Sequence, residues 1–159
     1  MEAEAEIFHY SGQDKSEIPD NITHVRCDSS VREIPRDLFY RCESLVTVEL
    51  NEGLKVIGER AFFFCTSLRN INFPSTLKEI GRAVFCDGAF STVELNEGLK
   101  AIGDSAFSGC PSLTSINFPS TLEVIGDTAF AFCTSLRSVD FPNGLKSIGS
   151  FALTCCECL

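Results

Sequence analysis

Residues 113–133 read LTSINFPSTLEVIGDTAFAFC, and this stretch is one copy of a motif that fills most of the chain. Further copies begin at Leu45, Leu68, Phe90 and Leu136, after a degenerate first copy in residues 22–44. One isoleucine of each copy recurs every 23 residues, with a single interval of 22 residues, at Ile34, Ile57, Ile80, Ile102, Ile125 and Ile148. Self-similarity at such a fixed period indicates a solenoid, in which each coil buries its apolar side chains against its neighbours.

A longer period of 45 residues overlies the first. The stretches that recur with this period are VTVELNEGLK at 46–55, which returns as STVELNEGLK at 91–100, and INFPSTLKEIG at 71–81, which returns as INFPSTLEVIG at 116–126. Duplication of a two-coil unit explains the pattern. The one shortened copy lacks a residue between Gly88 and Phe90, because Gly88 still keeps register with Cys65.

Each copy is predicted to form a short strand, a turn and a corner. The opening L-x-x-[VI]-x-[LF] alternates apolar and polar residues, which predicts a strand with one side toward the core. The triplet NEG, PST or PNG then turns the chain, and Leu-x-x-Ile-Gly predicts a tight corner. Sequences after the corner, such as residues 104–108, predict a helical or 3-10 turn on the convex side.

Two vertical ladders of side chains are predicted to fill the core. One contains Phe39, Phe62, Phe85, Phe107 and Phe130 and continues as Leu153, and the other contains Cys42, Cys65, Cys110, Cys133 and Cys156, interrupted by Gly88. Nine cysteines in a chain without a secretory signal favour free buried thiols. Disulfides between cysteines of neighbouring coils are the alternative, because coils about 5 Å apart place their Cα atoms within disulfide range.

The composition excludes several classes of function. The chain has 159 residues, of which 44% are hydrophobic and 22% charged, as in ordinary globular proteins. Its 13 Lys and Arg residues against 22 Asp and Glu residues give a net charge of −9, so no basic surface for nucleic acid is expected. No apolar run approaches the ~18 residues of a membrane span, and residues 1–6 are too acidic for a signal peptide. The localisation stays unknown on this basis, with the cytoplasm favoured.

The pattern L-x-x-I-x-[LF]-P-x-x-L-x-x-I-G-x-x-A-F-x-x-C resembles the BspA-like class of leucine-rich repeats, for example from Leu113 to Cys133. The resemblance implies an α/β solenoid, a right-handed superhelix with a parallel sheet on its concave face and short helical or 3-10 turns on its convex side. It also implies a role in protein binding or adhesion. The chain departs from the commoner leucine-rich repeat, whose Asn or Cys position is occupied here by Gly or Thr, so no asparagine ladder is expected.

We expect two segments along the chain. Residues 1–21 form an N-terminal capping segment, and residues 22–159 form a solenoid of about six coils whose last coil is uncapped. The last strand, residues 138–141, is predicted to present an unpaired edge. Four apolar side chains of the last coil are predicted to be only half covered, which makes end-to-end self-association possible: Leu145, Ile148, Leu153 and Cys156.

The residues offer little for chemistry, and we expect no catalytic residue, no cofactor and no metal site. His24 and Cys27 are near one another in sequence, but strand register predicts that the histidine points outward and the cysteine inward. The trio Cys155, Cys156 and Cys158 lacks a second cluster that would complete a zinc site. The chain is therefore not expected to be an enzyme.

The outward strand positions are the candidate binding surface. This face is polar and mildly acidic, with few anchors of the kind that dominate binding energy, so a solvated scaffold face is the alternative. Its residues are Arg26, Thr47, Glu49, Asn70, Asn72, Thr92, Glu94, Ser115, Asn117, Ser138 and Asp140. Phe63, Phe64 and Phe132 flank the phenylalanine ladder and are interpreted as extra core filling, with an exposed contact patch as the alternative.

The expected function is a non-enzymatic protein-interaction module that binds an unidentified protein partner through its concave face or its ends. A structural spacer, or a fragment of a longer surface or adhesion repeat protein, is the alternative.

Overall fold

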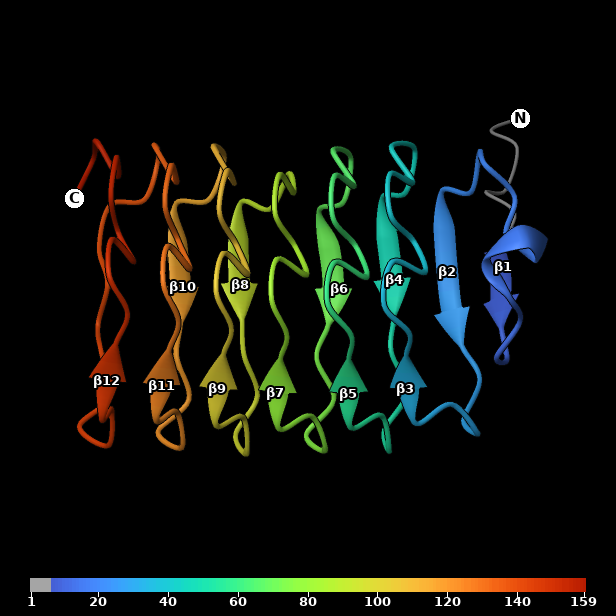
Figure 1. The fold of residues 1–159 in the computed structure, drawn as a ribbon, viewed down its shortest axis with the longest axis horizontal. Helices are drawn as coiled ribbons and strands as arrows, with labels where there is room; N and C mark the ends of the chain where they lie inside the picture. Colours follow the sequence, from blue (N-terminus) through green and yellow to red (C-terminus); the bar gives the residue numbers. More distant parts are fainter. Residues whose placement is uncertain (1–6) are drawn as a thin grey trace.

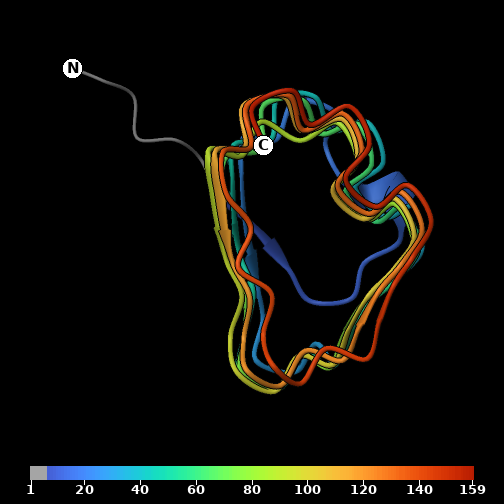
Figure 2. The same cartoon turned by 90° about the vertical axis from the view of Figure 1, so that its left-hand side faces the viewer.

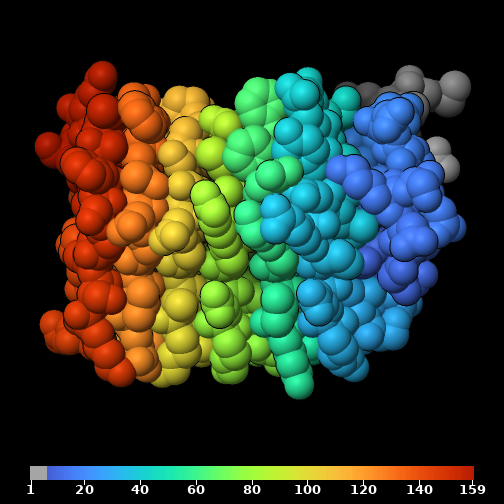
Figure 3. Space-filling view, in the orientation of Figure 1, coloured from blue at the N-terminus to red at the C-terminus, as the bar shows by residue number. Residues whose placement is uncertain are grey.

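The computed structural model describes residues 7–159, and these residues form a parallel β-solenoid of stacked coils (Figure 1). Each regular coil contributes one strand to a first sheet and one to a second sheet, and strands of the two sheets run in opposite directions (Figure 1). Viewed along the axis, the coils project closely onto one another around a common interior (Figure 2). In the space-filling view each coil appears as a vertical band, with the N-terminal segment at one end and the last coil at the other (Figure 3).

The first sheet is built from the alternating strands that the sequence predicts, and it is split into two parts. The first part orders its strands as β1 (Ile7–Tyr10), β2 (His24–Cys27), β4 (Thr47–Glu49) and β6 (Asn70–Asn72). The second part pairs β8 (Thr92–Glu94) with β10 (Ser115–Asn117). Inward residues meet at equivalent positions, so that Val25 lies opposite Val48 and Val48 opposite Ile71.

The second sheet was not predicted as a sheet, because a two-residue strand is too short to show an alternating pattern. It runs without interruption through six strands, which are β3 (Glu33–Ile34), β5 (Val56–Ile57), β7 (Glu79–Ile80), β9 (Ala101–Ile102), β11 (Val124–Ile125) and β12 (Ser147–Ile148). A glycine follows each of these strands except β3, which is followed by Pro35, and makes the predicted corner. A Cβ on Gly58 would approach the backbone nitrogen of Arg36 to 2.7 Å, so the coils touch here without room for a side chain.

The predicted helical or 3-10 turns on the convex side are wrong. In residues 58–64 the chain forms successive turns, with positive φ of 57° at Arg60 and 61° at Phe64. The N–H of Phe63 bonds within its coil to the carbonyl of Arg60, whereas the N–H of Phe62 bonds to the carbonyl of Val84 in the next coil. A helix would keep all of its hydrogen bonds within the coil, so these turns gain a third ladder between coils. Within residues 7–159, the 3-10 helix η1 (Lys15–Glu17) is the only helix, and it lies in the N-terminal segment.

Both predicted core ladders are present. The ladder phenylalanines are buried, and the rings of Phe39 and Phe62 stack with centroids 5.1 Å apart. In the cysteine ladder the Cys65 thiol donates to the carbonyl of Phe39 at 3.2 Å, and the same contact recurs from Cys133 to Phe107. All nine cysteines are free thiols in this structure.

The N-terminal segment lies against the first coil. β1 extends the first sheet beside β2, and the buried Tyr10 ring meets Phe39 edge-on with centroids 5.7 Å apart. The ammonium of Lys15, in η1, donates to the carbonyl of Asp37 at 2.7 Å. These contacts are those that a capping segment would make, and its capping role stays a prediction.

The last coil exposes apolar side chains. Leu145, Leu153 and Cys156 are half-buried, and the exposed fraction is 47% for Ile148 and 73% for Phe151. The strand predicted for residues 138–141 is not formed, although Arg137 donates to the carbonyl of Thr114 and so keeps the segment beside β10. The edge position alone does not account for this, because β12 of the same coil forms with β11 as its only neighbour.

Candidate functional site

The outward face of the first sheet carries the residues predicted for binding. Strand register places Thr47 opposite Asn70 and Glu49 opposite Asn72 in the first part of the sheet, and Thr92 opposite Ser115 and Glu94 opposite Asn117 in the second. Thr47 and Ser115 are half-buried, and the other nine candidates are exposed. Ser138 and Asp140 lie outside any strand, in the segment beside β10. The predicted columns therefore exist, but the split in the sheet interrupts them.

Three of the outward side chains already have partners within the chain. The guanidinium Nε of Arg26 lies 2.5 Å from a carboxylate oxygen of Glu49, and this hydrogen bond lowers the pKa of Glu49. Asn72 accepts from the N–H of Leu50 at 2.8 Å and donates to its carbonyl at 2.9 Å. The charge of Glu49 is thus partly neutralised, and the amide of Asn72 is occupied. Glu94 is the acidic side chain of these strands that has no ion-pair partner among residues 7–159.

The split in the sheet arises in the coil of 22 residues. Phe90 occupies the position held by Leu68 and Leu113 in the neighbouring copies, and its buried ring meets Phe85 edge-on with centroids 5.6 Å apart. The segment that leads into β8 is displaced relative to the other coils. Its hydrogen bond to the preceding coil is donated by the N–H of Ala89, to the carbonyl of Leu68, rather than by the N–H of Ser91. β8 consequently does not pair with β6, whereas β7 and β9 of the same two coils remain paired.

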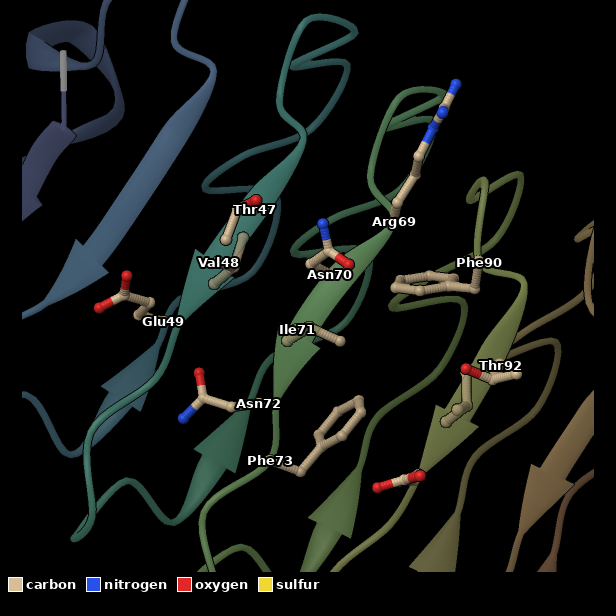
Figure 4. Close-up of a pocket in the computed structure, with 12 residues that line it drawn as sticks. Thr47, Val48, Glu49, Arg69, Asn70, Ile71, Asn72, Phe73, Phe90 and Thr92 are labelled. Carbon is tan, nitrogen blue, oxygen red and sulfur yellow. The ribbon is translucent and has the colours of Figure 1, made fainter. Parts of the chain in front are cut away.

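A depression of about 390 Å³ lies over this split (Figure 4). Six of the eleven predicted residues line it, namely Thr47, Glu49, Asn70, Asn72, Thr92 and Glu94. Its apolar lining includes Ile71, Phe73, Phe90 and Val93, and Figure 4 shows the Phe90 ring reaching toward β6. An apolar floor with a few polar groups at the rim is the usual composition of a binding site.

Sequence reasoning missed Arg69, Phe73 and Phe90 as residues of this site. Arg69 stands at the start of β6 in Figure 4, is exposed, and has no ion-pair partner within residues 7–159. The available signal was the 22-residue interval together with phenylalanine at a leucine position. A shortened copy in a solenoid locally breaks the register, and here the break leaves β6 and β8 unpaired.

The described residues do not assemble a nucleophile or a metal centre. Cys27 is buried on β2 while His24 is half-buried, and the imidazole Nδ1 of His24 lies 2.9 Å from the hydroxyl of Thr23. Burial raises the pKa of the Cys27 thiol to about 12, the reverse of what a nucleophilic thiolate needs. No three His, Cys, Asp or Glu side chains converge on a possible metal position within residues 7–159.

The interpretation of the additional phenylalanines as core filling is wrong for Phe132, whose exposed fraction is 55%. Phe63 and Phe64 are half-buried on the convex wall, where Phe63 stacks on Tyr40 with centroids 5.7 Å apart. Both Phe64 and Phe132 have positive φ near 61°. The sequence pattern does not show which positions of these turns adopt the left-handed conformation.

The repeats match the family described as BspA type leucine rich repeat region, in six copies, over residues 16–121 and 60–159. The chain belongs to this family. No curated protein matches it. No helix in the described part of the chain has the length and apolar character to cross a membrane.

Solved structures of leucine-rich repeat proteins share the fold. A leucine rich cell surface protein from Faecalibacterium prausnitzii is 31% identical with a TM-score of 0.77, over 87% of this chain and 38% of that one. A leucine rich repeat protein from T. pallidum is 34% identical with a TM-score of 0.57, over 87% of this chain and 57% of that one. The chain therefore spans less than two thirds of the length of either. A repeat protein from Eubacterium ventriosum, 19% identical with a TM-score of 0.70, shows the fold alone.

Proposed function

We propose that this BspA-type repeat chain is a non-enzymatic protein-binding module that uses the outward face of its first sheet. The observation that carries the proposal is the depression over the split, where exposed polar side chains surround an apolar floor. Leucine-rich repeat proteins generally bind proteins through extended surfaces of stacked repeats. The similar structure from Faecalibacterium prausnitzii is a cell surface protein, which supports a place for this chain within a longer surface or adhesion protein.

Capture of a partner from an extract of the source organism tests this function. The immobilised chain is compared with the double variant Glu49→Lys and Glu94→Lys, whose two side chains are exposed and line the depression. The matched control carries Glu33→Lys and Glu79→Lys, two exposed positions on the second sheet. We expect a protein that the wild type and the control retain and the first variant loses. Equal retention by all three would favour the spacer function and contradict this one.

A second role, end-to-end association, is favoured by the face of the last coil. The N–H groups of Thr128 and Phe130 bond to carbonyls of the last coil, but the equivalent N–H groups of Phe151 and Leu153 have no acceptor within residues 7–159. The exposed Ile148 and Phe151 lie in the same coil. Apolar side chains beside unpaired donors form a surface that another repeat surface can cover. We propose a second copy of the chain as the occupant.

A further inference from the structure

The split between β6 and β8 leaves backbone groups without partners in the middle of the first sheet. Asn70 donates its N–H to Val46 in β4's coil, so the backbone groups of Ile71 point the other way, toward the split. On the other side Thr114 donates to Ser91, so the groups of Thr92 face the split. No backbone hydrogen bond joins β6 to β8 in the described chain. The depression thus offers donors and acceptors as well as apolar surface.

The two ends of the depression carry opposite charges. Arg69 immediately precedes β6 at one end, and Glu94 is the last residue of β8 at the other. Both side chains are exposed, and neither has an ion-pair partner within residues 7–159. In the repeat register Arg69 corresponds to Ser91, which lies three residues before Glu94. At roughly 3.3 Å per residue of extended chain, the charges are about 10 Å apart along the strand direction.

We propose that the depression binds one extended segment of a partner protein that carries an acidic and a basic side chain about three residues apart, with an apolar side chain between them. This proposal rests on the proposed protein-binding function and names its partner chemistry. The acidic side chain pairs with Arg69 and the basic one with Glu94. The apolar side chain covers the half-buried Ile71, and the segment's backbone bonds to the unpaired groups of Ile71 and Thr92.

Charge complementarity distinguishes this occupant from others. A segment with two basic side chains places one beside Arg69, and a segment with two acidic side chains places one beside Glu94. Glu49 does not add a free acidic charge to the rim, because Arg26 pairs with it. The mixed charge of the rim therefore selects a mixed-charge segment, although the net charge of −9 alone would suggest a basic partner.

Synthetic peptides of equal length test the proposal. Their central sequences are Glu-Ser-Ile-Lys, Lys-Ser-Ile-Lys and Glu-Ser-Ile-Glu, and binding is measured by fluorescence anisotropy and by NMR shifts of the Ile71 and Thr92 amides. We expect wild type to prefer the mixed-charge peptide about threefold over either like-charge peptide, as surface ion pairs contribute modestly. Arg69→Glu shifts the preference to Lys-Ser-Ile-Lys, and Glu94→Lys shifts it to Glu-Ser-Ile-Glu. All substituted side chains are exposed, so we expect the circular dichroism spectra of the variants to match that of the wild type.

Glu79→Lys is the matched control, because Glu79 is exposed on β7 of the second sheet and does not line the depression. We expect it to keep the wild-type order of the three peptides. The proposal is overturned if Arg69→Glu leaves that order unchanged, if Glu79→Lys changes it equally, or if none of the peptides shifts the Ile71 and Thr92 amides. In each of these cases the capture experiment still decides the protein-binding function independently, because it requires no particular peptide sequence.

Discussion

The Phe90 ring fills the space that a side chain at position 88 would occupy. A Cβ on Gly88 would lie 2.5 Å from Cε2 of Phe90, closer than side-chain atoms pack. Five other copies have cysteine at the corresponding position. The copy with glycine is the one that has lost a residue, and the next copy begins with Phe90 in place of leucine. The three departures from the repeat therefore belong together, and they produce the split where the candidate site lies.

Restoring the cysteine alone should consequently destabilise the protein. Gly88→Cys inserts a side chain against the buried Phe90 ring, and overpacking of this kind costs about 1–3 kcal/mol. Urea unfolding measures the change in the free energy of unfolding. In the double variant with Phe90→Leu the smaller side chain makes room, so we expect part of the loss to be recovered. A neutral or stabilising Gly88→Cys would show that the ring is not confined by position 88.

The decrease in the free energy of unfolding at acidic pH should depend on Glu123. Its carboxylate lies 2.8 Å from the ammonium of Lys100 and 2.5 Å from that of Lys146, and these hydrogen bonds lower the pKa of Glu123 to about 2. A lowered pKa gives stability that is present above the ordinary value of the carboxyl group and is lost as the pH falls toward about 2. Glu123→Gln should flatten the decline of unfolding free energy below about pH 4.5.

Glu33→Gln is the control for that experiment, since Glu33 is exposed on β3 and has no ion-pair partner within residues 7–159. Its decline between about pH 4.5 and pH 2 should parallel that of the wild type. Equal slopes for the wild type and Glu123→Gln would mean that the two lysines do not hold the carboxylate in solution.

Features that repeat in every coil could be predicted from the sequence. Features that depend on a single coil, or on backbone hydrogen bonds, could not. Periodic burial of Phe62 and Cys65 follows from their register, because a core ladder needs the same apolar position in each copy. The second sheet and the convex turns depend on where N–H groups such as that of Phe62 find acceptors in the next coil. Side-chain polarity carries no information about that choice, which is why a helical turn was predicted instead.

The sequence correctly predicted that most of the candidate face is exposed. It did not predict that the first sheet is split between β6 and β8. Register from the repeat places Thr92 beside Asn70, as in the other coils, and gives no indication that Phe90 holds the two strands apart. The residues that distinguish the site, Arg69 and Phe90, lie one residue before β6 and two before β8, at positions that are structural in a regular coil. Their role depends on the packing of a single irregular coil.

Exposed and buried cysteines should differ in their reactivity toward thiol reagents. Cys155 and Cys158 are exposed on the last coil, whereas five cysteines are buried, namely Cys27, Cys42, Cys65, Cys110 and Cys133. A thiol-labelling reagent at neutral pH should modify the two exposed thiols quickly. The buried thiols should react only after unfolding, because they are inaccessible and because burial raises the pKa of Cys27, for example, to about 12.

Mass spectrometry of the labelled protein, with and without denaturant, counts the modified thiols. Cys155→Ser with Cys158→Ser is the matched variant and should lose the fast phase while keeping the slow one. Detection of disulfides in protein purified without reductant would contradict the prediction and would favour oxidation between neighbouring ladder positions.

Self-association through the last coil should weaken when that face becomes charged. Ile148 is 47% exposed and Val139 half-buried, so Val139→Lys with Ile148→Glu adds charge to a surface that a second copy would have to desolvate. Light scattering over a concentration series should show a rise in mean mass for the wild type and a smaller rise, or none, for the variant.

Val139 packs partly against the core, so a second variant separates association from folding. Phe151→Ser removes a ring that is 73% exposed, and the loss of stability should be small while association weakens. Hydrogen exchange adds an independent readout, because the N–H groups of Phe151 and Leu153 have no acceptor within residues 7–159 and should gain protection only on association. A wild type that stays monomeric at high concentration, with these two amides unprotected throughout, would rule out a second copy as the occupant of this face.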